Sequence, residues 1–439
     1  MTWTNQKLSG RIPELDGIRG LAILLVLVLH YVVELGIPCV TRNWQFRTLL
    51  LFRLSWSGVD LFFVLSGFLI GGILLDAKYA DNYYRTFYLR RFYRIVPLYA
   101  LLILILVAGT LCVNHTAKPL TALFNWRIPF LAYAMFMQNV SMTLHGTYGC
   151  SWMGVTWSLA VEEQFYLLLP FVIRRLSHKG IMSFAIGMIV TAPVLRTILG
   201  HYGANGLAIY TLLPCRADAL GCGLLVAIAC RNQTVWTWLA SHRRYVYAAF
   251  AVFGSGILIW ILGDVSFGYT WMAGFYTSLL ILAVVSPGRM ERSIFRSFVL
   301  MRLGTVAYAL YLFHPGILRL YHFFFFGKLP SIHDFPTFWV TLLSLCTVVL
   351  FAELSWMIFE KPLIRFARIR FQYVFAGHST KALFFQPILA DEDNPAPAAG
   401  KAVSPGAAAE TEPVFAEDSP YSTTSTRVTI SSRGRSAGQ

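Results

Sequence analysis

The sequence predicts an all-α protein, a polytopic membrane helical bundle of about ten transmembrane helices with both termini in the cytoplasm. Hydrophobic residues make up 56% of the 439 residues and charged residues only 13%, whereas soluble domains carry about a quarter charged residues. The mean hydropathy is +0.59. One water-soluble core could not hide so much apolar surface, so lipid is the expected solvent.

Each predicted span is a mostly apolar run of about 20 residues, the length that crosses a bilayer. The fourth and sixth spans keep this character although charged residues interrupt them, and the ninth contains a His-Pro pair. The apolar run 128–140 is too short to span and is predicted to be interfacial or re-entrant. In chain order the spans are 17–36, 55–75, 95–113, 155–173, 181–199, 207–229, 245–263, 270–286, 303–325 and 337–358.

The number of Lys and Arg residues alternates between high and low in successive gaps between these spans. Gaps on the side of the termini hold roughly 22 of them and the opposite gaps roughly six, the bias expected when the first side is cytoplasmic. The net charge of +15 is therefore interpreted as a topology signal, and no nucleic acid partner is expected. The membrane domain is predicted over 1–375. A tail over 385–439, rich in Ala, Pro, Ser and Thr, is predicted to be disordered.

Charged and polar residues at bilayer depth are costly, which makes them functional candidates. Arg19 and His30 lie eleven residues apart on the first span, close to three helical turns and roughly 16 Å along the axis, so they are expected to share a face. His30 lies toward the outer half, where carboxylates of the second and fourth spans are expected at similar depth. The remaining candidates are Asp60, Glu162, Glu163, Arg216, Asp218 and His314.

Each candidate also has a structural interpretation. Arg216 and Asp218 are two residues apart and suggest a buried ion pair, and a buried residue such as His314 commonly satisfies a neighbour's hydrogen bond. Arg91 and Arg94 are at positions where topology anchors occur.

A histidine beside a carboxylate is general-base machinery, because the acid fixes the tautomer and stabilises the imidazolium. We expect His30 to be the base, oriented by Asp60 or Glu162. No G-x-S-x-G elbow lies near it, so direct attack by a substrate hydroxyl on an activated acyl donor is favoured over an acyl-enzyme. The basic run 88–94 offers the guanidiniums of Arg90, Arg91 and Arg94 for phosphate recognition.

Several of these blocks resemble acyltransferase family 3, multi-pass membrane enzymes that acylate carbohydrates. The resemblance implies an acyl-CoA donor, most often acetyl-CoA, as co-substrate, with no permanently bound cofactor or metal, and a carbohydrate hydroxyl as acceptor. It also implies a place in the plasma (inner) membrane. The matching blocks are 14–22 with His30, 58–70, 91–94, 156–166, 216–223 and 308–315.

Through this resemblance the family's roles pass to particular residues. Arg19 and His30 become the essential pair, with support from Arg91, Arg94 and Glu162. Arg216 is assigned to the developing oxyanion. Supporting roles near substrate or transition state fall to Glu163, Asp218, His314, Trp157 and Ser158.

Two other classes of protein fit the composition. A transporter or flippase for polysaccharide or lipid-linked sugar also carries intramembrane charges, and inverted repeats would favour it, but no convincing repeat is present. A receptor or sensor would tolerate the loss of His30. The sequence leaves the oligomeric state, the acceptor and the acyl chain length open.

Overall fold

A computed structural model describes residues 12–36, 52–112, 123–124, 127–262, 268–285 and 288–375. Within these ranges the chain is helical and contains no strand, which confirms the all-α class. The predicted tail over 385–439 lies outside the described residues.

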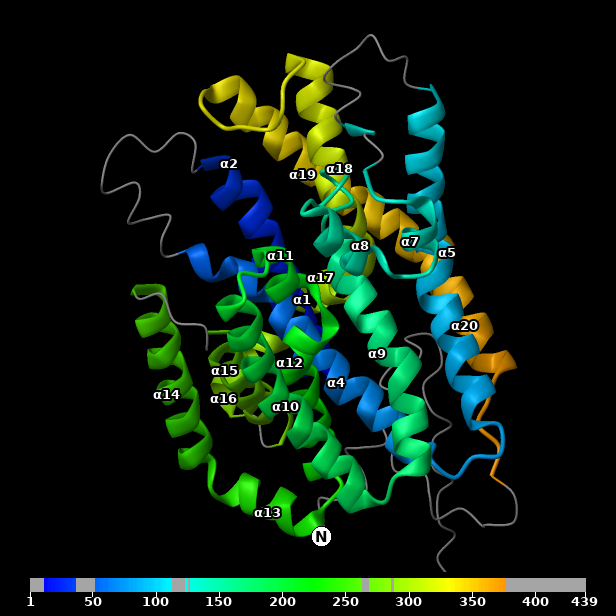
Figure 1. Ribbon diagram of the computed structural model, residues 1–439, viewed down its shortest axis with the longest axis vertical. Coiled ribbons are helices and arrows are strands. Elements are labelled where there is room, and N and C mark those ends of the chain that lie inside the picture. Colours follow the sequence, from blue (N-terminus) through cyan, green and yellow to red (C-terminus); the bar gives the residue numbers. More distant parts are fainter. Residues whose placement is uncertain are drawn as a thin grey trace, which may run out of the picture. The chain divides into compact units, whose positions relative to one another are not determined.

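The described parts of the predicted spans lie largely on helices, with non-helical interior positions at Leu212 and Val306 (Figure 1). Of the described helices, six are long and apolar enough to cross a membrane by length and composition. These six stretches are Pro13–Gly36, Leu54–Asp76, Tyr83–Cys112, His178–His201, Gly206–Ala229 and Phe335–Arg370.

The first half of the bundle contains α1 (Pro13–Val28), a π-helical turn (Leu29–Val33), α2 (Glu34–Gly36), α4 (Gly58–Asp76), α5 (Tyr83–Cys112), α7 (Phe130–Ala134), α8 (Gln138–His145), α9 (Thr156–Arg175) and α10 (His178–His201). The second half contains α11 (Gly206–Thr211), α12 (Leu213–Ala229), α13 (Gln233–Ser241), α14 (Arg243–Leu262), α15 (Gly268–Val284), α16 (Arg289–Phe295), α17 (Phe298–Thr305), α18 (Ala307–Phe326), α19 (Phe335–Ser355), a second π-helical turn (Trp356–Glu360) and α20 (Lys361–Arg370).

The ninth predicted span, 303–325, is wrong as a continuous helix. The chain bends by 77° between α17 and α18, at Val306. Just before the bend α17 crosses α1 closely, and a Cβ on Gly304 would lie 1.9 Å from the backbone oxygen of Asp16. The predicted short segment 128–140 is confirmed as too short to span, since it holds α7 and the start of α8.

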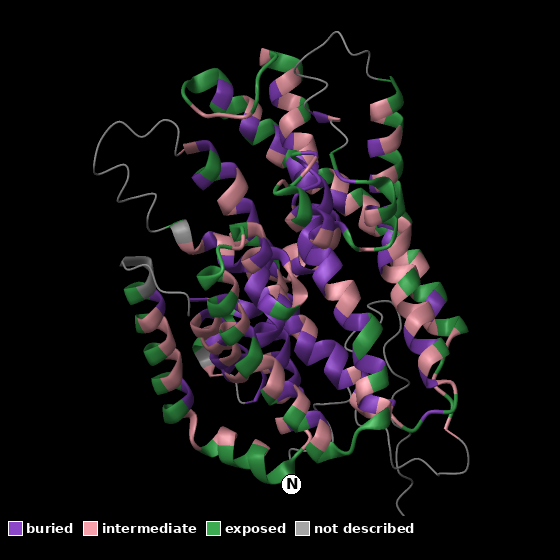
Figure 2. Cartoon of the chain, viewed as in Figure 1, coloured by how far each residue is buried: buried purple, intermediate pink, exposed green. Residues whose placement is uncertain are grey.

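Glycines allow close helix crossings in the core. A Cβ on Gly20 of α1 would lie 1.9 Å from the Leu300 oxygen of α17. A Cβ on Gly67 of α4 would lie 2.0 Å from the Leu220 oxygen of α12. Apolar surface cannot drive helix association within lipid, so such backbone approaches supply much of the packing. Figure 2 shows buried residues concentrated in the central helices, while α14 and the outer faces of α5 are exposed.

Candidate active site

A cavity of about 150 Å³ lies where α1, α4, α5, α9 and α18 meet, with the second π-helical turn at its rim. Ligand pockets usually measure about 300–1,000 Å³, so this cavity suits a slender chain and not a bulky head group. Its polar lining residues are Arg19, Ser66, Arg91, Arg94, Ser158, Glu162, Tyr166, Thr305, Tyr308, Tyr311 and Glu360.

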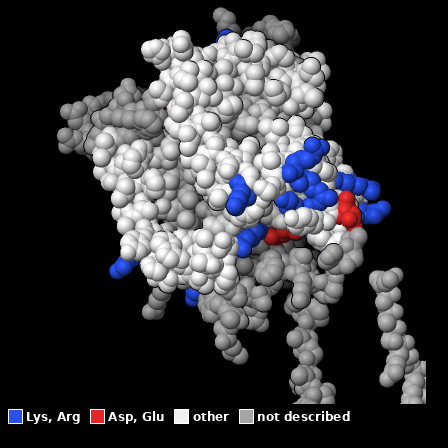
Figure 3. Space-filling view, turned by 60° about the horizontal axis from the view of Figure 1, so that its bottom comes forward, with Lys and Arg blue, Asp and Glu red and all other residues white. Residues whose placement is uncertain are grey.

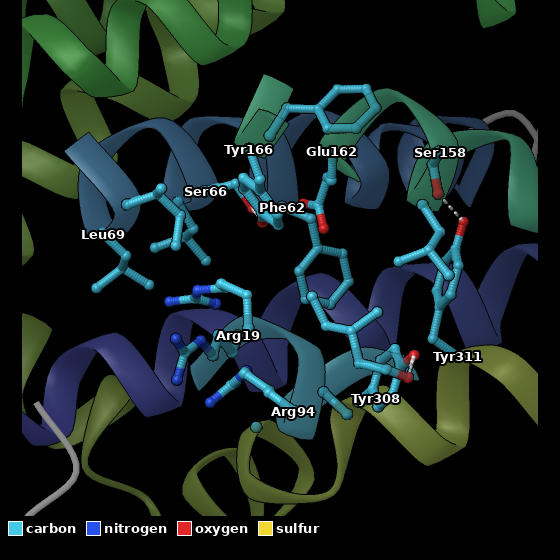
Figure 4. A pocket seen from close by; sticks show the side chains of 18 of the residues that line it. Arg19, Phe62, Ser66, Leu69, Arg94, Ser158, Glu162, Tyr166, Tyr308 and Tyr311 are labelled. Atoms are coloured by element: carbon cyan, nitrogen blue, oxygen red, sulfur yellow. Dashed lines mark hydrogen bonds between the residues drawn. The ribbon is translucent and has the colours of Figure 1, made fainter. Parts of the chain in front are cut away.

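Guanidinium groups occupy one end of the cavity, as Figure 4 shows for Arg19 and Arg94. Arg19 Nη1 lies 3.4 Å from Asp16 Oδ1. The Arg91 guanidinium lies 5.5 Å from the Tyr166 ring centroid. In the part of the chain that the structure describes, neither Arg91 nor Arg94 forms a salt bridge with a carboxylate. This end is therefore suited to an anionic group.

Helical spacing explains which basic residues of α5 reach the cavity. Arg91 and Arg94 are three residues apart and share one face. Arg90 faces elsewhere, because its side chain donates to the Phe371 carbonyl oxygen (2.6 Å) and lies 5.2 Å from the Tyr373 ring centroid. The structure thus places Arg90 outside the cavity, although the sequence predicted that it would bind phosphate together with Arg91 and Arg94.

Helix α9 contributes three residues to the wall of the cavity, spaced four apart along one face: Ser158, Glu162 and Tyr166. Glu162 accepts a hydrogen bond from the Ser66 hydroxyl, which in turn accepts one from the Tyr166 hydroxyl (2.9 Å). Glu163 does not line the cavity, and its buried Oε1 has no hydrogen-bond partner among the described residues. Of the two adjacent acids, only Glu162 lines the cavity.

At the opposite end of the cavity, a hydrogen bond of 2.5 Å joins the hydroxyls of Ser158 and Tyr311 (Figure 4). Tyr311 also donates to the Val155 carbonyl oxygen at 2.8 Å. The Tyr311 ring lies 6.1 Å from the His314 ring, which lies 4.9 Å from the His30 ring. His30 does not line the cavity. Arg19 and His30, expected on one face of the helix, therefore do not line the same cavity.

His30 lies in the first π-helical turn and has a different carboxylate partner from the expected one. Its Nδ1 lies 2.9 Å from Oε2 of Glu34, four residues later. Neither Asp60 nor Glu162 orients it. The pairing assigns the Nδ1 proton to the bond with the carboxylate and leaves Nε2 as the basic nitrogen. The signal was present in the sequence, because residues at i and i+4 of a helix are neighbours.

His314 is buried beside His30. Its Nδ1 lies 2.9 Å from the carbonyl oxygens of both Leu310 and Tyr311, so Nδ1 carries the proton and Nε2 is an acceptor. That Nε2 has no hydrogen-bond partner among the described residues. The two histidines therefore hold two unprotonated nitrogens in one small region.

The other predicted acids and bases form a separate buried network. Asp60 pairs with Arg216, whose guanidinium lies 4.1 Å from the Tyr269 ring centroid. Asp218 accepts from Arg196 at 2.9 Å. The expected pairing of Arg216 with Asp218 is therefore wrong, since helical geometry turns each toward a different neighbour.

This network lies outside the lining of the cavity. Trp157 belongs with it, because its ring lies 6.0 Å from the Arg216 guanidinium and 4.6 Å from the Tyr210 ring. The structure thus places Asp60, Arg216, Asp218 and Trp157 behind the wall of the cavity, where the Phe63 ring of the lining lies 5.8 Å from the Arg216 guanidinium.

Comparison with known proteins gives the context for this arrangement. The family model described as an acyltransferase domain matches residues 12–357. The relatives include "Putative O-acetyltransferase SACOL0978" of Staphylococcus aureus strain COL, which is 26% identical over 377 residues and covers 82% of this chain and 58% of its own length. O-acetyltransferase OatA of Staphylococcus aureus strain NCTC 8325 is 26% identical over 376 residues, or 80% of this chain and 57% of its own.

The chain thus spans less than two thirds of the length of these relatives. No solved structure matches the chain. Because the family model covers most of the folded part, the resemblance is confirmed, and the chain belongs to acyltransferase family 3.

Proposed function

We propose that the protein is a membrane O-acyltransferase that moves an acyl group, in the simplest case acetyl, from acyl-CoA to a carbohydrate hydroxyl. The observation that carries the proposal is the pairing of a narrow cavity, bounded by three guanidinium groups, with a His-Glu dyad beyond its opposite end. Membership of the family and the names of its relatives support acyl transfer.

The donor enters from the guanidinium end. Arg91 and Arg94 bind phosphate oxygens of CoA, and Arg19 positions the chain that carries the thioester. The cavity of about 150 Å³ admits the slender pantetheine arm and leaves the nucleotide at the mouth. Separation of the Ser158 and Tyr311 hydroxyls then lets the thioester reach His30, roughly 16 Å along the helix from Arg19.

The tautomer assigned to His30, with its proton on Nδ1, sets the course of the proposed reaction. Nε2 of His30 takes the proton from the acceptor hydroxyl while the oxygen attacks the thioester carbonyl carbon. Glu34 stabilises the imidazolium that forms. The tetrahedral intermediate expels the CoA thiolate, which receives the proton from His30, so the ester and CoA-SH leave and the enzyme returns to its initial state.

The orientation in the membrane belongs to the same proposal. We place ten spans across the plasma membrane with both termini, and the guanidinium mouth, in the cytoplasm, where CoA is found. Figure 3 supports this, since Lys and Arg side chains gather at the end of the molecule that lies at the bottom of Figure 1.

Transfer of label from acetyl-CoA to a sugar acceptor by the purified full-length protein tests the proposal. We expect His30→Ala to lower the rate by about 10²–10⁴-fold, the usual contribution of a general base. His178→Ala, at an exposed position, serves as the matched control. Unchanged transfer by the His30 variant would refute the base assignment. Absence of transfer, together with movement of lipid-linked sugar across vesicles, would favour a flippase.

A further inference from the structure

A second cavity, of about 410 Å³, lies between α5, α18 and α19. Its lining is apolar throughout, and it includes Leu102, Trp152, Phe313, Gly316 and Ile317. An apolar cavity of about 150 Å³ already admits benzene, so this one has room for a longer hydrocarbon segment. Nothing in the proposed donor path uses it.

The cavity has a buried floor and an exposed rim. Leu102 and Trp152 on the floor are 1% and 5% exposed, whereas Leu101, Ile105 and Leu320 on the rim are 37%, 41% and 46% exposed. The rim residues belong to α5 and α18, at levels that the proposed orientation places in the outer half of the bilayer. The opening therefore faces lipid, and an occupant enters sideways from the membrane.

A cation lies next to the cavity on α18. Arg319 precedes the rim residue Leu320, and its Nη1 donates to the Pro315 carbonyl oxygen at 3.2 Å. That bond uses one of five N–H donors, and Arg319 forms no salt bridge in the described part of the chain. A guanidinium at this depth is costly, which marks it as a functional candidate.

Arg319 also interacts electrostatically with the Glu34 carboxylate and with Cys150. The Cys150 thiol and the Trp152 indole N–H both donate to the Leu123 carbonyl oxygen at 2.6 Å, and Leu123 and Trp152 line the cavity. Arg319 thus lies among the cavity-lining residues of α18 in the chain and interacts with both Glu34 and Cys150, whose thiol shares its acceptor with Trp152 of the lining.

We propose that the acceptor is a saccharide carried on a lipid phosphate, whose hydrocarbon chain occupies this cavity and whose phosphate binds Arg319. The inference rests on the proposed acyl transfer and names the form in which the acceptor arrives. The chain enters between Leu101 and Leu320, and the guanidinium fixes the phosphate. Along α18, Arg319 is five residues or roughly 7.5 Å from His314, so the first sugar reaches the histidine pair.

Photolabelling of the full-length protein in detergent tests the binding site directly. The probes are a diazirine-bearing hexadecyl phosphate and the matching hexadecyl alcohol, with labelled peptides identified by mass spectrometry. We expect the phosphate to label the segments 101–105 and 313–320. Ile317→Phe, which fills the cavity, should lower labelling by both probes several-fold, whereas Leu343→Phe, on the exposed face of α19, should not.

Arg319→Gln tests the contribution of the phosphate to binding separately from that of the hydrocarbon chain. Loss of a charge-assisted contact should lower phosphate labelling about tenfold and leave alcohol labelling unchanged. Arg175→Gln, at an exposed position on α9, is the control. Equal labelling by both probes, unaffected by Arg319→Gln, would identify a bulk lipid site and overturn the proposal. Labelling that Ile317→Phe leaves unchanged would also overturn it; Leu320→Phe, at the rim, repeats this test if the Ile317 variant does not fold.

A transfer assay distinguishes this inference from the proposed function. With labelled acetyl-CoA, Ile317→Phe should lower transfer to a polyprenyl-phosphate-linked sugar several-fold and leave transfer to a water-soluble glycoside unchanged. Equal loss with both acceptors would refute the lipid site while the acyltransferase proposal stands. Absence of transfer to either acceptor by the unsubstituted protein would refute the proposed function itself.

Discussion

The pairing of His30 with Glu34 leads to the sharpest prediction, tested by Glu34→Gln. Gln has the same shape and still accepts a hydrogen bond from Nδ1, so the substitution removes charge and little else. A hydrogen bond to a charged group contributes about 1.5–3 kcal/mol, and each 1.4 kcal/mol changes a rate about tenfold. The Glu34 side chain is 48% exposed, so solvent screening places the expected loss near the lower limit, about tenfold in kcat.

A double-mutant cycle checks that this loss acts through the histidine. Transfer from labelled acetyl-CoA is measured for Glu34→Gln, His30→Ala and the double variant. Because Glu34 acts only by orienting and stabilising His30, Glu34→Gln should have no further effect in the His30→Ala protein. A tenfold loss that persists without the imidazole would refute the dyad. Full activity of Glu34→Gln would show that the 2.9 Å contact has no role in transfer.

Three other predictions concern the donor mouth and stability. Arg91→Gln combined with Arg94→Gln should weaken binding of CoA at least tenfold in calorimetry and reduce its salt dependence; unchanged binding would remove these residues from the donor site. Gly304→Val should lower the thermal midpoint sharply, because its Cβ would meet a backbone oxygen of α1 at 1.9 Å, whereas Gly187→Ala meets nothing within 4 Å and should be neutral or slightly stabilising. The pKa of Asp334 is lowered by its hydrogen bonds with Thr337, so the carboxylate stabilises the fold above the unfolded pKa of about 3.9, and this stabilisation is lost as pH falls through the folded pKa. Asp334→Asn should therefore reduce the fall of the thermal midpoint with decreasing pH in this acidic range. An unchanged pH dependence would contradict this prediction.

Hydrophobic run length and charge alternation were sufficient to place helices, because lipid imposes a fixed length on each span. They did not predict the break at Val306, since the apolar run passes through it unchanged. Beside the break Gly304 meets the backbone of Asp16, and a contact between segments so far apart leaves no local pattern.

For the candidate site, too, the sequence holds more information on contacts along one helix than on contacts between helices. The basic run 88–94 grouped Arg90 with Arg91 and Arg94, of which only the last two line the cavity. A spacing of three or four residues along one helix would have found Glu34 beside His30. Pairing between helices could not be predicted, because similar depth says nothing about rotation. Asp60 lies in the half of its helix that was expected, yet it faces Arg216 and not His30.

The hydroxyl pair of Ser158 and Tyr311 has a consequence for the cell's energy supply. A membrane enzyme with a polar cleft open at one face and an ionisable dyad near the other risks a continuous file of water along which protons move. We expect the side chains of Ser158 and Tyr311, joined at 2.5 Å, to fill the space that such a file of water would need while the enzyme is idle. We expect that a variant with small residues at both positions would dissipate a proton gradient across vesicles even when no acyl donor is supplied.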